Sequence, residues 1–489
     1  MAGEEALQSS TNQLSTSIPD ILDAFTAKPW IPKLYQERGI KWLLQLTQEQ
    51  VAAEAGSALF LPPGLGKTSI GLAAILELKR LGIPHRTLVL APLMVCRTTW
   101  MTEPQKWGQF QGLRVGLAHG PDKKLILNDP YYDIVVMNYD GIEWATEMLA
   151  DGHNFAVLLC DEIPRLKNTA SKRYKRFKPI IHTFKMRWGF TGTPAANGLT
   201  DLFGQVYVLD LGARLGRFIT KFRLEYFHQK LFDPYRYYIT SEKANKLSEK
   251  LKDLAMYVKP EEWLALPPLI TIELPVELPP STMKKYKFLE DEFMLRLEDM
   301  TLTVANAGVL TSKLRQFTGG AVYTSNQVWE SVDEAKLDRL ESLIEEMAGE
   351  PLLVSYQFDH ELQRFLERFP GSLYLKGGMS ATQVTSTVES WNSGTIPVMF
   401  VQPQTAALGL NLQFGGSAIV WFTMTYNLED YIQLNKRLHR QGQEKPVRVY
   451  LLAAQKTIDQ WVTKVLANKD ITQNDLLATL RFDRTDLLC

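Results

Sequence analysis

The stretch SALFLPPGLGKTSIGLAAILELKRL (57–81) indicates the fold class, because a short apolar run leads through a Gly-rich turn into a helical pattern. A phosphate-binding loop requires this order of strand, tight turn and helix N-terminus. Gly64 and Gly66 would let backbone N–H groups approach phosphate oxygens. Lys67 would reach the β- and γ-phosphates, and the Thr68 hydroxyl would hold Mg²⁺. Leu61 replaces the first Gly of the usual pattern, so the triplet alone also fits a surface turn, but the context favours a nucleotide site.

Similar apolar runs recur along the chain and alternate with helical patterns. They are RTLVLA (86–91), YDIVVM (132–137), FAVLLCD (155–161), PLLVSY (351–356), PVMFVQ (397–402), SAIVWF (417–422) and VRVYLL (447–452). Such strands predict parallel sheets covered on both faces, the α/β class. The prolines of LPPLITIELPVELPPS (266–281) favour a connector or an edge element over a central strand. We therefore expect one lobe before about residue 265, a connector with helices to about 330, and a second lobe after it.

The composition is that of a folded intracellular protein. A length of 489 residues predicts two or three domains, and 45% hydrophobic with 22% charged residues excludes wholesale disorder. Three cysteines are too few for a disulfide framework or a zinc knuckle. No apolar run reaches the roughly 18–20 residues that span a bilayer, and the acidic, Ser/Thr-rich start is no secretory signal. We expect an intracellular protein with no membrane partner.

The balance of 54 basic and 54 acidic residues requires any nucleic-acid surface to be local, since nucleic-acid-binding domains are usually basic. The stretch 165–188 contains nine Lys or Arg and no acidic residue. Such a run can be a solvated helix face, but nine unopposed charges favour phosphate contact. We predict DNA contacts by Lys172, Arg173, Lys175 and Arg176, and a backbone grip without base reading by Thr191, Gly192 and Thr193. The interleaved aromatic residues are expected to be packing residues: Tyr174, Phe177 and Trp188.

AVLLCDEIPRLKN (156–168) ends an apolar strand with Asp161 and Glu162. Carboxylates at the C-terminal edge of a parallel strand lie where α/β folds bind ligands. Asp161 as a Mg²⁺ ligand and Glu162 as a carboxylate that orients water would be the minimal apparatus for ATP hydrolysis. An exposed acidic pair at a strand end is common, but its pairing with a phosphate loop favours the catalytic interpretation.

DEIPRLKN also resembles the DEAH/DEGH-type box, followed by R-x-K-N, of the Swi/Snf-type ATPases in helicase superfamily two. Further motifs resemble that family in the same order, over roughly residues 30–470. They are PKLYQERGIKWLL (32–44), RTLVLAPLMVCRTTWMTEPQKW (86–107), GFTGTPAANGLTDLF (189–203), KLRQFTGGAVY (313–323), EAKLDRLESLIEEM (334–347), QTAALGLNLQFGGSAIVWF (404–422) and YIQLNKRLHRQGQEKPVRVYLL (431–452).

The resemblance implies two RecA-like lobes, each a mainly parallel sheet with helices on both faces, joined by a helical connector. We expect a flexible tail over 1–28, an ATP-binding lobe with a helical extension over 29–265, a connector over 266–330, and a second lobe with an arginine-finger motif over 331–489.

The resemblance also assigns roles to residues. Gln36 is expected on the adenine side and Gln433 at the nucleotide, while DNA contacts are implied for Pro92, Thr405 and Asn411. Arg437 and Arg440 match the arginine fingers. Independently of the family, a guanidinium from a neighbouring domain stabilises charge on the γ-phosphoryl oxygens. Two arginines at i and i+3 of a predicted helix can point the same way, although such a pair alone also fits a solvated basic helix.

Two positions depart from the family pattern. Pro164 replaces the usual His of the DEAH-type box, which puts in doubt the link from that box to the TGTP motif, and Tyr426 stands where the family commonly has Trp. The predicted hydrolytic residues are all present, so we expect an active DNA-dependent ATPase that uses ATP and Mg²⁺.

The predicted function is an ATP-driven motor that binds and translocates on double-stranded DNA without sequence specificity. One alternative is a strand-separating DNA or RNA helicase, and another is a nucleotide-gated DNA-binding interaction module. We expect a monomer of bacterial or phage origin, cytoplasmic or nucleoid-associated. Because little of the chain lies outside the two lobes, a protein partner such as a nuclease is also expected.

Overall fold

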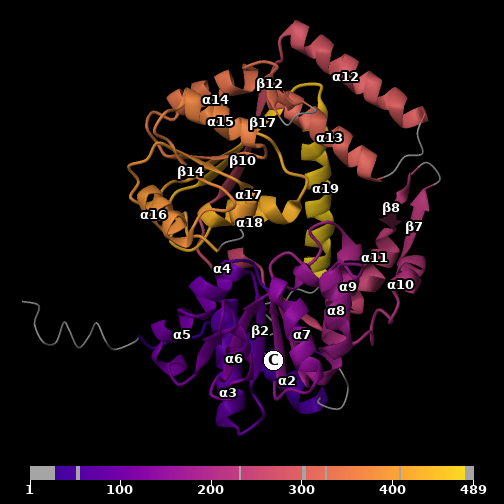
Figure 1. Ribbon diagram of the computed structural model, residues 1–489, viewed down its shortest axis with the longest axis vertical. Coiled ribbons are helices and arrows are strands. Elements are labelled where there is room, and N and C mark those ends of the chain that lie inside the picture. Colours follow the sequence, from indigo (N-terminus) through magenta and orange to yellow (C-terminus); the bar gives the residue numbers. More distant parts are fainter. Residues whose placement is uncertain are drawn as a thin grey trace, which may run out of the picture.

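The computed structural model describes residues 28–50, 56–230, 233–299, 304–324, 328–406 and 409–479. The predicted tail over 1–28 lies almost wholly outside these residues. All eight predicted apolar runs form strands in two parallel sheets, so the expected α/β class with two parallel-sheet lobes is confirmed. The lobes lie one above the other, with the N-terminal lobe below in indigo and magenta and the second lobe above in orange (Figure 1).

The first sheet has seven strands in the order β3-β4-β2-β5-β6-β1-β9. Their bounds are β1 (Ser57–Phe60), β2 (Thr87–Ala91), β3 (Val115–Leu117), β4 (Ile134–Asn138), β5 (Val157–Asp161), β6 (Met186–Thr191) and β9 (Ala255–Tyr257). Every neighbouring pair is parallel, and β1, for example, pairs Phe60 with Thr191 of β6. This register brings the ends of β1, β5 and β6 to one edge, where the predicted phosphate loop and acidic pair begin.

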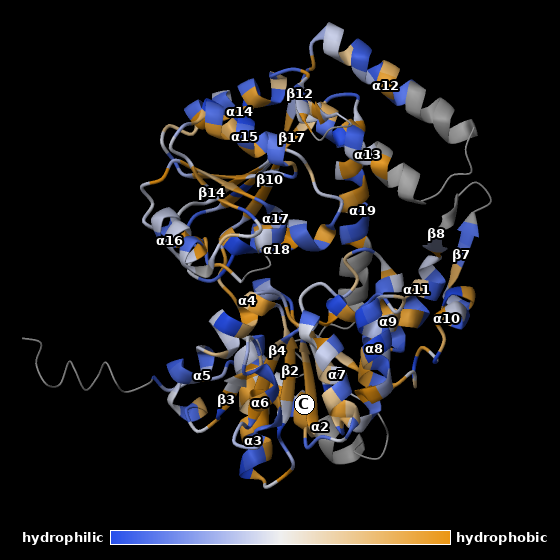
Figure 2. Ribbon diagram, viewed as in Figure 1, coloured by the Kyte–Doolittle hydropathy of each residue, from blue (hydrophilic) through white to orange (hydrophobic). Residues whose placement is uncertain are grey.

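Both faces of the first sheet are covered by apolar packing. Along β2, Leu88 and Leu90 pack into the core on one face and Val89 into the core on the other. Hydropathy colouring shows orange strands inside each lobe and blue helix faces outside it (Figure 2). The helices of this lobe are α2 (Leu34–Gln50), α3 (Lys67–Arg80), α4 (Leu93–Val95), α5 (Glu103–Lys106), α6 (Lys123–Asn128), α7 (Ile142–Ala150), α8 (Lys172–Phe177), α9 (Leu202–Asp210), α10 (Ile219–Tyr226) and α11 (Ser241–Glu249). The strands β7 (Phe227–Lys230) and β8 (Asp233–Ile239) form a separate antiparallel pair.

The second sheet has six parallel strands in the order β10-β17-β16-β13-β15-β14. Their bounds are β10 (Leu269–Val276), β13 (Leu352–Ser355), β14 (Leu373–Leu375), β15 (Val398–Val401), β16 (Ala418–Trp421) and β17 (Val447–Ala454). Its helices are α14 (Ala335–Glu346), α15 (Asp359–Arg368), α16 (Ala381–Asn392), α17 (Pro403–Ala406), α18 (Leu428–Leu438) and α19 (Ile458–Thr479). Helix α19 runs down from the second lobe toward the first (Figure 1) and contacts α11 there.

The predicted connector over 266–330 differs from the structure at its start. Its Pro-rich stretch contains β10, which pairs with β17 as the edge strand of the second sheet. Pro275 is tolerated there because one side of an edge strand needs no N–H donor. The chain thus passes between the sheets after β9 and before β10. Helices α12 (Pro280–Asp299) and α13 (Val304–Thr318) and the antiparallel strands β11 (Ala321–Tyr323) and β12 (Trp329–Ser331) follow.

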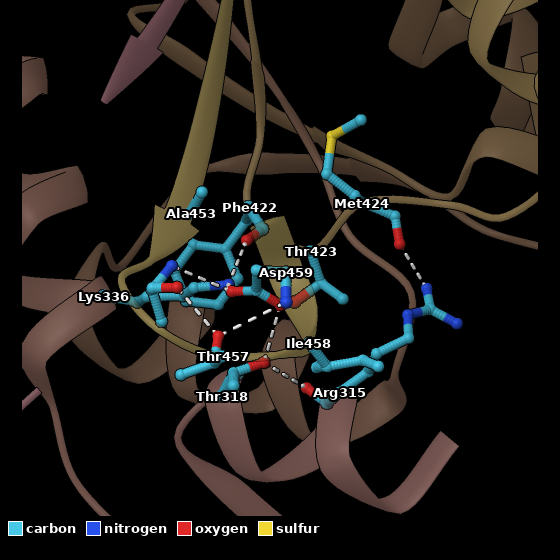
Figure 3. Close-up of polar contacts among 12 residues, drawn as sticks. Arg315, Thr318, Lys336, Phe422, Thr423, Met424, Ala453, Thr457, Ile458 and Asp459 are labelled. Atoms are coloured by element: carbon cyan, nitrogen blue, oxygen red, sulfur yellow. Dashed lines mark hydrogen bonds and ion pairs between the residues drawn. The ribbon is translucent and has the colours of Figure 1, made fainter. Parts of the chain in front are cut away.

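A buried ion pair joins α13, α14 and α19 at the end of the second sheet (Figure 3). Lys336 Nζ lies 2.6 Å from Asp459 Oδ2, and both side chains are almost fully buried. Thr318 Oγ1 donates to Asp459 Oδ1 at 2.9 Å, and Lys336 Nζ donates to the Phe422 carbonyl at 3.0 Å. Buried charges are tolerated where pairing and further hydrogen bonds satisfy them. This network fixes the start of α19 against the second lobe.

Candidate active site

The predicted phosphate loop joins β1 to the N-terminus of α3. Gly64 and Gly66 have φ of 89° and 74°, a left-handed region that favours glycine. Gln36 lies against this loop, because a Cβ on Gly66 would come within 2.5 Å of Gln36 Nε2. Gln36 Nε2 also donates to the Leu65 carbonyl at 3.3 Å. The structure therefore brings Gln36 and the loop together, while its place on the adenine side stays a prediction.

Lys67 begins α3 and folds back over the loop. Its Nζ donates to the Leu61 carbonyl at 2.7 Å, so the position that lacks the usual Gly holds the lysine through its backbone. Burial lowers the pKa of Lys67, while the negative charges of Glu162 and Asp161 oppose this shift. Thr68, the next residue of α3, is half-buried.

Asp161 is the last residue of β5 and points into a buried polar environment. The Trp100 indole Nε1 donates to Asp161 Oδ2 at 2.9 Å, and Tyr139 donates from its hydroxyl to the Asp161 carbonyl at the same distance. Burial, then the neighbouring charge of Glu162, raises the pKa of Asp161 to about 6, and Lys67 opposes the shift. Asp161 is thus ionised at neutral pH.

Glu162 follows the strand in a left-handed backbone conformation with φ of 60°. Its Oε2 accepts a hydrogen bond of 3.0 Å from Thr191 Oγ1, and Thr191 Oγ1 in turn accepts from the Thr193 backbone N–H at 3.1 Å. A direct contact between the acidic box and the TGTP motif is therefore present, even though Pro164 has no side-chain hydrogen-bonding group.

For the hydroxyls of Thr191 and Thr193 these contacts correct the prediction of a grip on DNA, whereas Gly192 is half-buried and its backbone contact with DNA stays a prediction. Thr191 is 0% exposed and Thr193 2% exposed, so neither hydroxyl can reach an external phosphate. Gly192 packs against the phosphate loop, since a Cβ there would lie 3.0 Å from Pro62 Cα. The hydroxyls of this segment therefore lie inside the site and not on the surface. Its sequence showed small donors but could not show which side they faced.

On the second lobe, α18 carries Glu429, Gln433 and Arg437 at intervals of four residues, which places them along one helix face. Arg437 interacts electrostatically with Glu162 of the first lobe. Burial, then the nearby charge of Arg440, lowers the pKa of Arg437 to about 10. Both guanidinium groups also act on Lys67, so the arginines face the phosphate loop across the interlobe cleft.

The helix that carries the arginines is shorter than predicted. It ends at Leu438, and His439 leaves helical geometry with ψ of 77°. The His439 Nε2 atom lies 2.7 Å from the Pro267 carbonyl in the segment before β10. Arg440 therefore follows the helix in a bend, and its approach to Arg437 is not set by helical i, i+3 spacing.

A cavity of about 640 Å³ opens between the lobes beside the acidic box. The first lobe contributes Pro164, Arg165 and Lys167, and the second contributes Glu429 and Gln433, among other residues. The lobes also touch nearby, since Ala196 after the TGTP motif packs into the core of the second lobe. The candidate site is therefore assembled from both lobes.

The predicted basic run forms α8 and its flanks. Lys175 and Arg176 are exposed, whereas Lys172 Nζ lies 2.8 Å from Glu143 and Arg173 forms an ion pair with Asp140. The aromatic residues named above for this run are buried packing residues, as predicted: Tyr174, Phe177 and Trp188.

Of the residues implied to contact DNA by resemblance, Asn411 is exposed and Pro92 is half-buried. Thr405 is 4% exposed and its hydroxyl donates to the Gln402 carbonyl at 2.6 Å, so Thr405 is a poor candidate for DNA contact in this conformation. The loops that carry Pro92 and Asn411 approach each other, because a Cβ on Gly409 would lie 3.8 Å from Val95 Cγ2.

Three contacts of the site were not among the sequence predictions: Trp100 donates to Asp161, Thr191 donates to Glu162, and Gln433 donates to Glu429. Only the last had a usable signal, since Glu429 precedes Gln433 by four residues on a predicted helix. The first two contacts join strands and loops that are far apart in the sequence.

A phosphate loop and acidic pair on one lobe, faced by arginines from a second, define a nucleotide-dependent enzyme of helicase type. The family models for the SNF2-related domain and the helicase conserved C-terminal domain match residues 35–316 and 335–442. The chain belongs to the SNF2-related family. The expected family and enzyme class, a DNA-dependent ATPase that binds ATP, are thereby confirmed.

The chain is 31% identical over 472 residues to the putative protein p41 of Acyrthosiphon pisum secondary endosymbiont phage 1, covering 93% of this chain and 99% of that protein. It is 25% identical to an uncharacterized ATP-dependent helicase of Mycoplasma pneumoniae over 92% of this chain. It is 24% identical to the putative ATP-dependent helicase/translocase YwqA of Bacillus subtilis over 90% of this chain. The chain spans only 42% and 48% of the lengths of these two proteins.

Among solved structures, the Sulfolobus solfataricus SWI2/SNF2 ATPase core in complex with dsDNA matches with a TM-score of 0.45 and 20% identity, covering 93% of this chain and 96% of that one. Within the described part of the chain, no helix is long and apolar enough to cross a membrane.

Proposed function

We propose that this protein is an ATP-driven motor that moves on double-stranded DNA without sequence specificity. The observation that supports this most is the cavity of about 640 Å³ beside the acidic box, which Pro164, Arg165 and Lys167 of the first lobe and Glu429 and Gln433 of the second line together. Hydrolysis of a nucleotide bound between two lobes changes the contacts that hold the lobes together. Alternating closure and opening of the lobes can then move their contacts along a polymer.

The side chains of the site fit ATP and Mg²⁺. Lys67 and the backbone of the Gly64–Gly66 turn, at the N-terminus of a helix of 14 residues, suit phosphate oxygens. The Thr68 hydroxyl and the Asp161 carboxylate are the hard oxygen ligands that Mg²⁺ prefers, and Mg²⁺ is commonly held by one or two protein ligands beside phosphates. When bound, the ion would neutralise charge on the phosphates. Gln36 and Gln433 would complete the nucleotide site.

Each remaining residue has a defined task in the proposed hydrolysis. The Glu162 carboxylate is held at Oε2 by Thr191, which leaves Oε1 as the oxygen to orient water and accept its proton. Arg437 and Arg440 would stabilise negative charge on the γ-phosphoryl oxygens from the opposite lobe. Because burial excludes water around Arg437, this stabilisation is stronger than it would be at an exposed position.

Duplex DNA is proposed as the track for two reasons. The exposed cations Lys175 and Arg176 follow the acidic box closely in the chain, and phosphate contacts by such residues carry no sequence preference. The relatives named above include proteins called helicase and helicase/translocase, which link this kind of chain to nucleic acids. The contacts proposed with DNA also include Pro92 and Asn411.

The test compares the ATPase rate without nucleic acid and with duplex DNA, single-stranded DNA and RNA at one salt concentration. The proposal expects the strongest stimulation by duplex DNA and loss of turnover in Lys67→Ala. Stimulation only by single strands or RNA would support a strand-separating helicase instead. Unchanged turnover in Glu162→Gln would support a nucleotide-gated binding module. The monomeric state, a nuclease partner and a cytoplasmic or nucleoid location stay predictions.

A further inference from the structure

Helix α18 presents a line of three functional groups to the interlobe cleft. Glu429, Gln433 and Arg437 are spaced by four residues, and the first two line the cavity beside the acidic box. Only Gln433 and Arg437 have a task in the proposed hydrolysis, which leaves the carboxylate one turn earlier unexplained.

Glu429 contacts Gln433 directly. The Gln433 Nε2 atom donates to Glu429 Oε1 at 3.2 Å. The position of Glu429 is itself fixed, because its backbone N–H donates to the side-chain Oδ1 of Asn427, the N-cap of α18, at 3.2 Å. A carboxylate in the first turn is also favoured by the helix dipole.

The chemistry of this contact determines how the amide of Gln433 is oriented. An ionised carboxylate accepts hydrogen bonds and cannot donate one, so it can bind only the NH₂ end of an amide. The carbonyl oxygen of Gln433 is then left as the acceptor for a donor in the cleft. Pro164, on the opposite wall of the cavity, has no group that could orient the amide from the first lobe.

The charged groups around Glu429 come from both lobes. Glu162, Arg165 and Lys167 face it from the first lobe, and Asp430 is its neighbour on α18. Lys167 is also paired with Asp201 at 3.1 Å. Burial, then the charge of Glu162, raises the pKa of Glu429 to about 7, so the carboxylate is fully ionised only in mildly alkaline solution.

We propose that Glu429 is a positioning residue for ATP hydrolysis, which holds the amide of Gln433 so that its carbonyl oxygen serves the cleft. This inference rests on the proposed function of the site. Glu429 would then act on the reaction only through its hydrogen bond with Gln433.

The experiment measures kcat and KM for ATP at pH 8.5, with and without duplex DNA, in wild type and Glu429→Gln. The substituted amide keeps the shape of the side chain but can donate as well as accept, so it no longer fixes the orientation of Gln433. We expect kcat to fall about 10-fold with KM changed less than about 2-fold. The matched control is Asp430→Asn, which removes the same charge from the same helical turn and should stay within about 2-fold of wild type.

A double-mutant cycle with Gln433→Ala separates positioning from a general effect on the helix. If Glu429 acts through Gln433, Glu429→Gln has little further effect in the Gln433→Ala background. Equal losses in both backgrounds, an unchanged kcat in Glu429→Gln, or an equal loss in Asp430→Asn would overturn the assignment. Turnover measured without DNA keeps the two proposals distinguishable. If duplex DNA does not stimulate the wild type, the motor proposal is contradicted. The effect of Glu429→Gln on turnover without DNA still tests the role of Glu429 in that case.

Discussion

Thr191 joins two parts of the active site through one hydroxyl group. It accepts the Thr193 backbone N–H and donates to Glu162 Oε2, so the end of β6 holds the carboxylate proposed to orient water. A hydrogen bond between a buried hydroxyl and a charged group contributes about 1.5–3 kcal/mol. Thr191 therefore supplies the contact between acidic box and TGTP motif that the presence of Pro164 put in doubt.

Thr191→Val should lower kcat for ATP about 10-fold or more, because Glu162 loses its only described side-chain donor and can rotate away. Thr191→Ser keeps the hydroxyl and should restore most of the rate. Steady-state ATPase assays on both variants provide the measurement. A valine variant as active as wild type, or a serine variant as impaired as valine, would contradict this role.

His360 is a buried neutral histidine in the second lobe. Its side chain is 0% exposed and stacks on Phe358 with ring centroids 5.5 Å apart, and neither ring nitrogen has a hydrogen-bond partner among the described residues. Burial lowers the pKa of His360 to about 3. The unfolded chain then binds a proton between about pH 3 and 6.5 that the folded chain does not, so stability falls as the pH drops through this range.

His360→Phe should therefore gain stability relative to wild type as the pH falls. Between pH 7 and pH 5 the difference in the free energy of unfolding should shift by about 2 kcal/mol in favour of the variant. Urea unfolding of both proteins at the two pH values measures this shift, and the other six histidines are common to both. A difference that does not change with pH would show that His360 binds its proton equally well in the folded and the unfolded chain, and would contradict the prediction.

At the scale of elements, the strands that could be predicted were those with continuous apolar sequence. The strand β6 was not among them, because it contains Arg187 within a basic stretch. The structure satisfies that guanidinium with the carbonyls of Leu209 and Phe184 at 2.8 and 2.7 Å. The end of α18 could not be predicted either, because it involves the contact of His439 with Pro267, which lies 172 positions away in the sequence.

Helix α8 is the element proposed to bind DNA, through its exposed cations Lys175 and Arg176. Charge reversal of Lys175 and Arg176 should weaken binding to duplex DNA and reduce the slope of log affinity against log salt by about 1 to 2, since each phosphate contact contributes about 0.9. Fluorescence anisotropy over a salt series measures both quantities.

The control for α8 reverses Lys284 and Lys285, which are exposed on α12 at the far end of the molecule (Figure 1). This variant has the same net charge as the α8 variant and should bind DNA nearly as wild type does. An equal loss of affinity in both variants would indicate a general effect of net charge and refute the assignment to α8.

Over the whole molecule, 54 basic and 54 acidic residues balance to a net charge of zero, so a surface that binds DNA must be local. On α8, Lys175 and Arg176 are exposed while Lys172 and Arg173 are paired with acidic residues, so the surface proposed to bind DNA is small and local. The sequence motifs predicted the two lobes and most of the nucleotide site. They could not predict the bridge made by α19, where Lys469 Nζ donates to the Tyr426 carbonyl at 2.8 Å and to Asn197 of the first lobe at 3.4 Å. That bridge depends on how the lobes are placed in space.

The most direct test of the central claim is displacement of a short third strand from duplex DNA. A motor on the duplex should release the third strand with ATP, leave the two duplex strands paired, and lose this activity in Lys67→Ala and Arg437→Ala. ATP hydrolysis that is stimulated by duplex DNA without release of the third strand would contradict the claim.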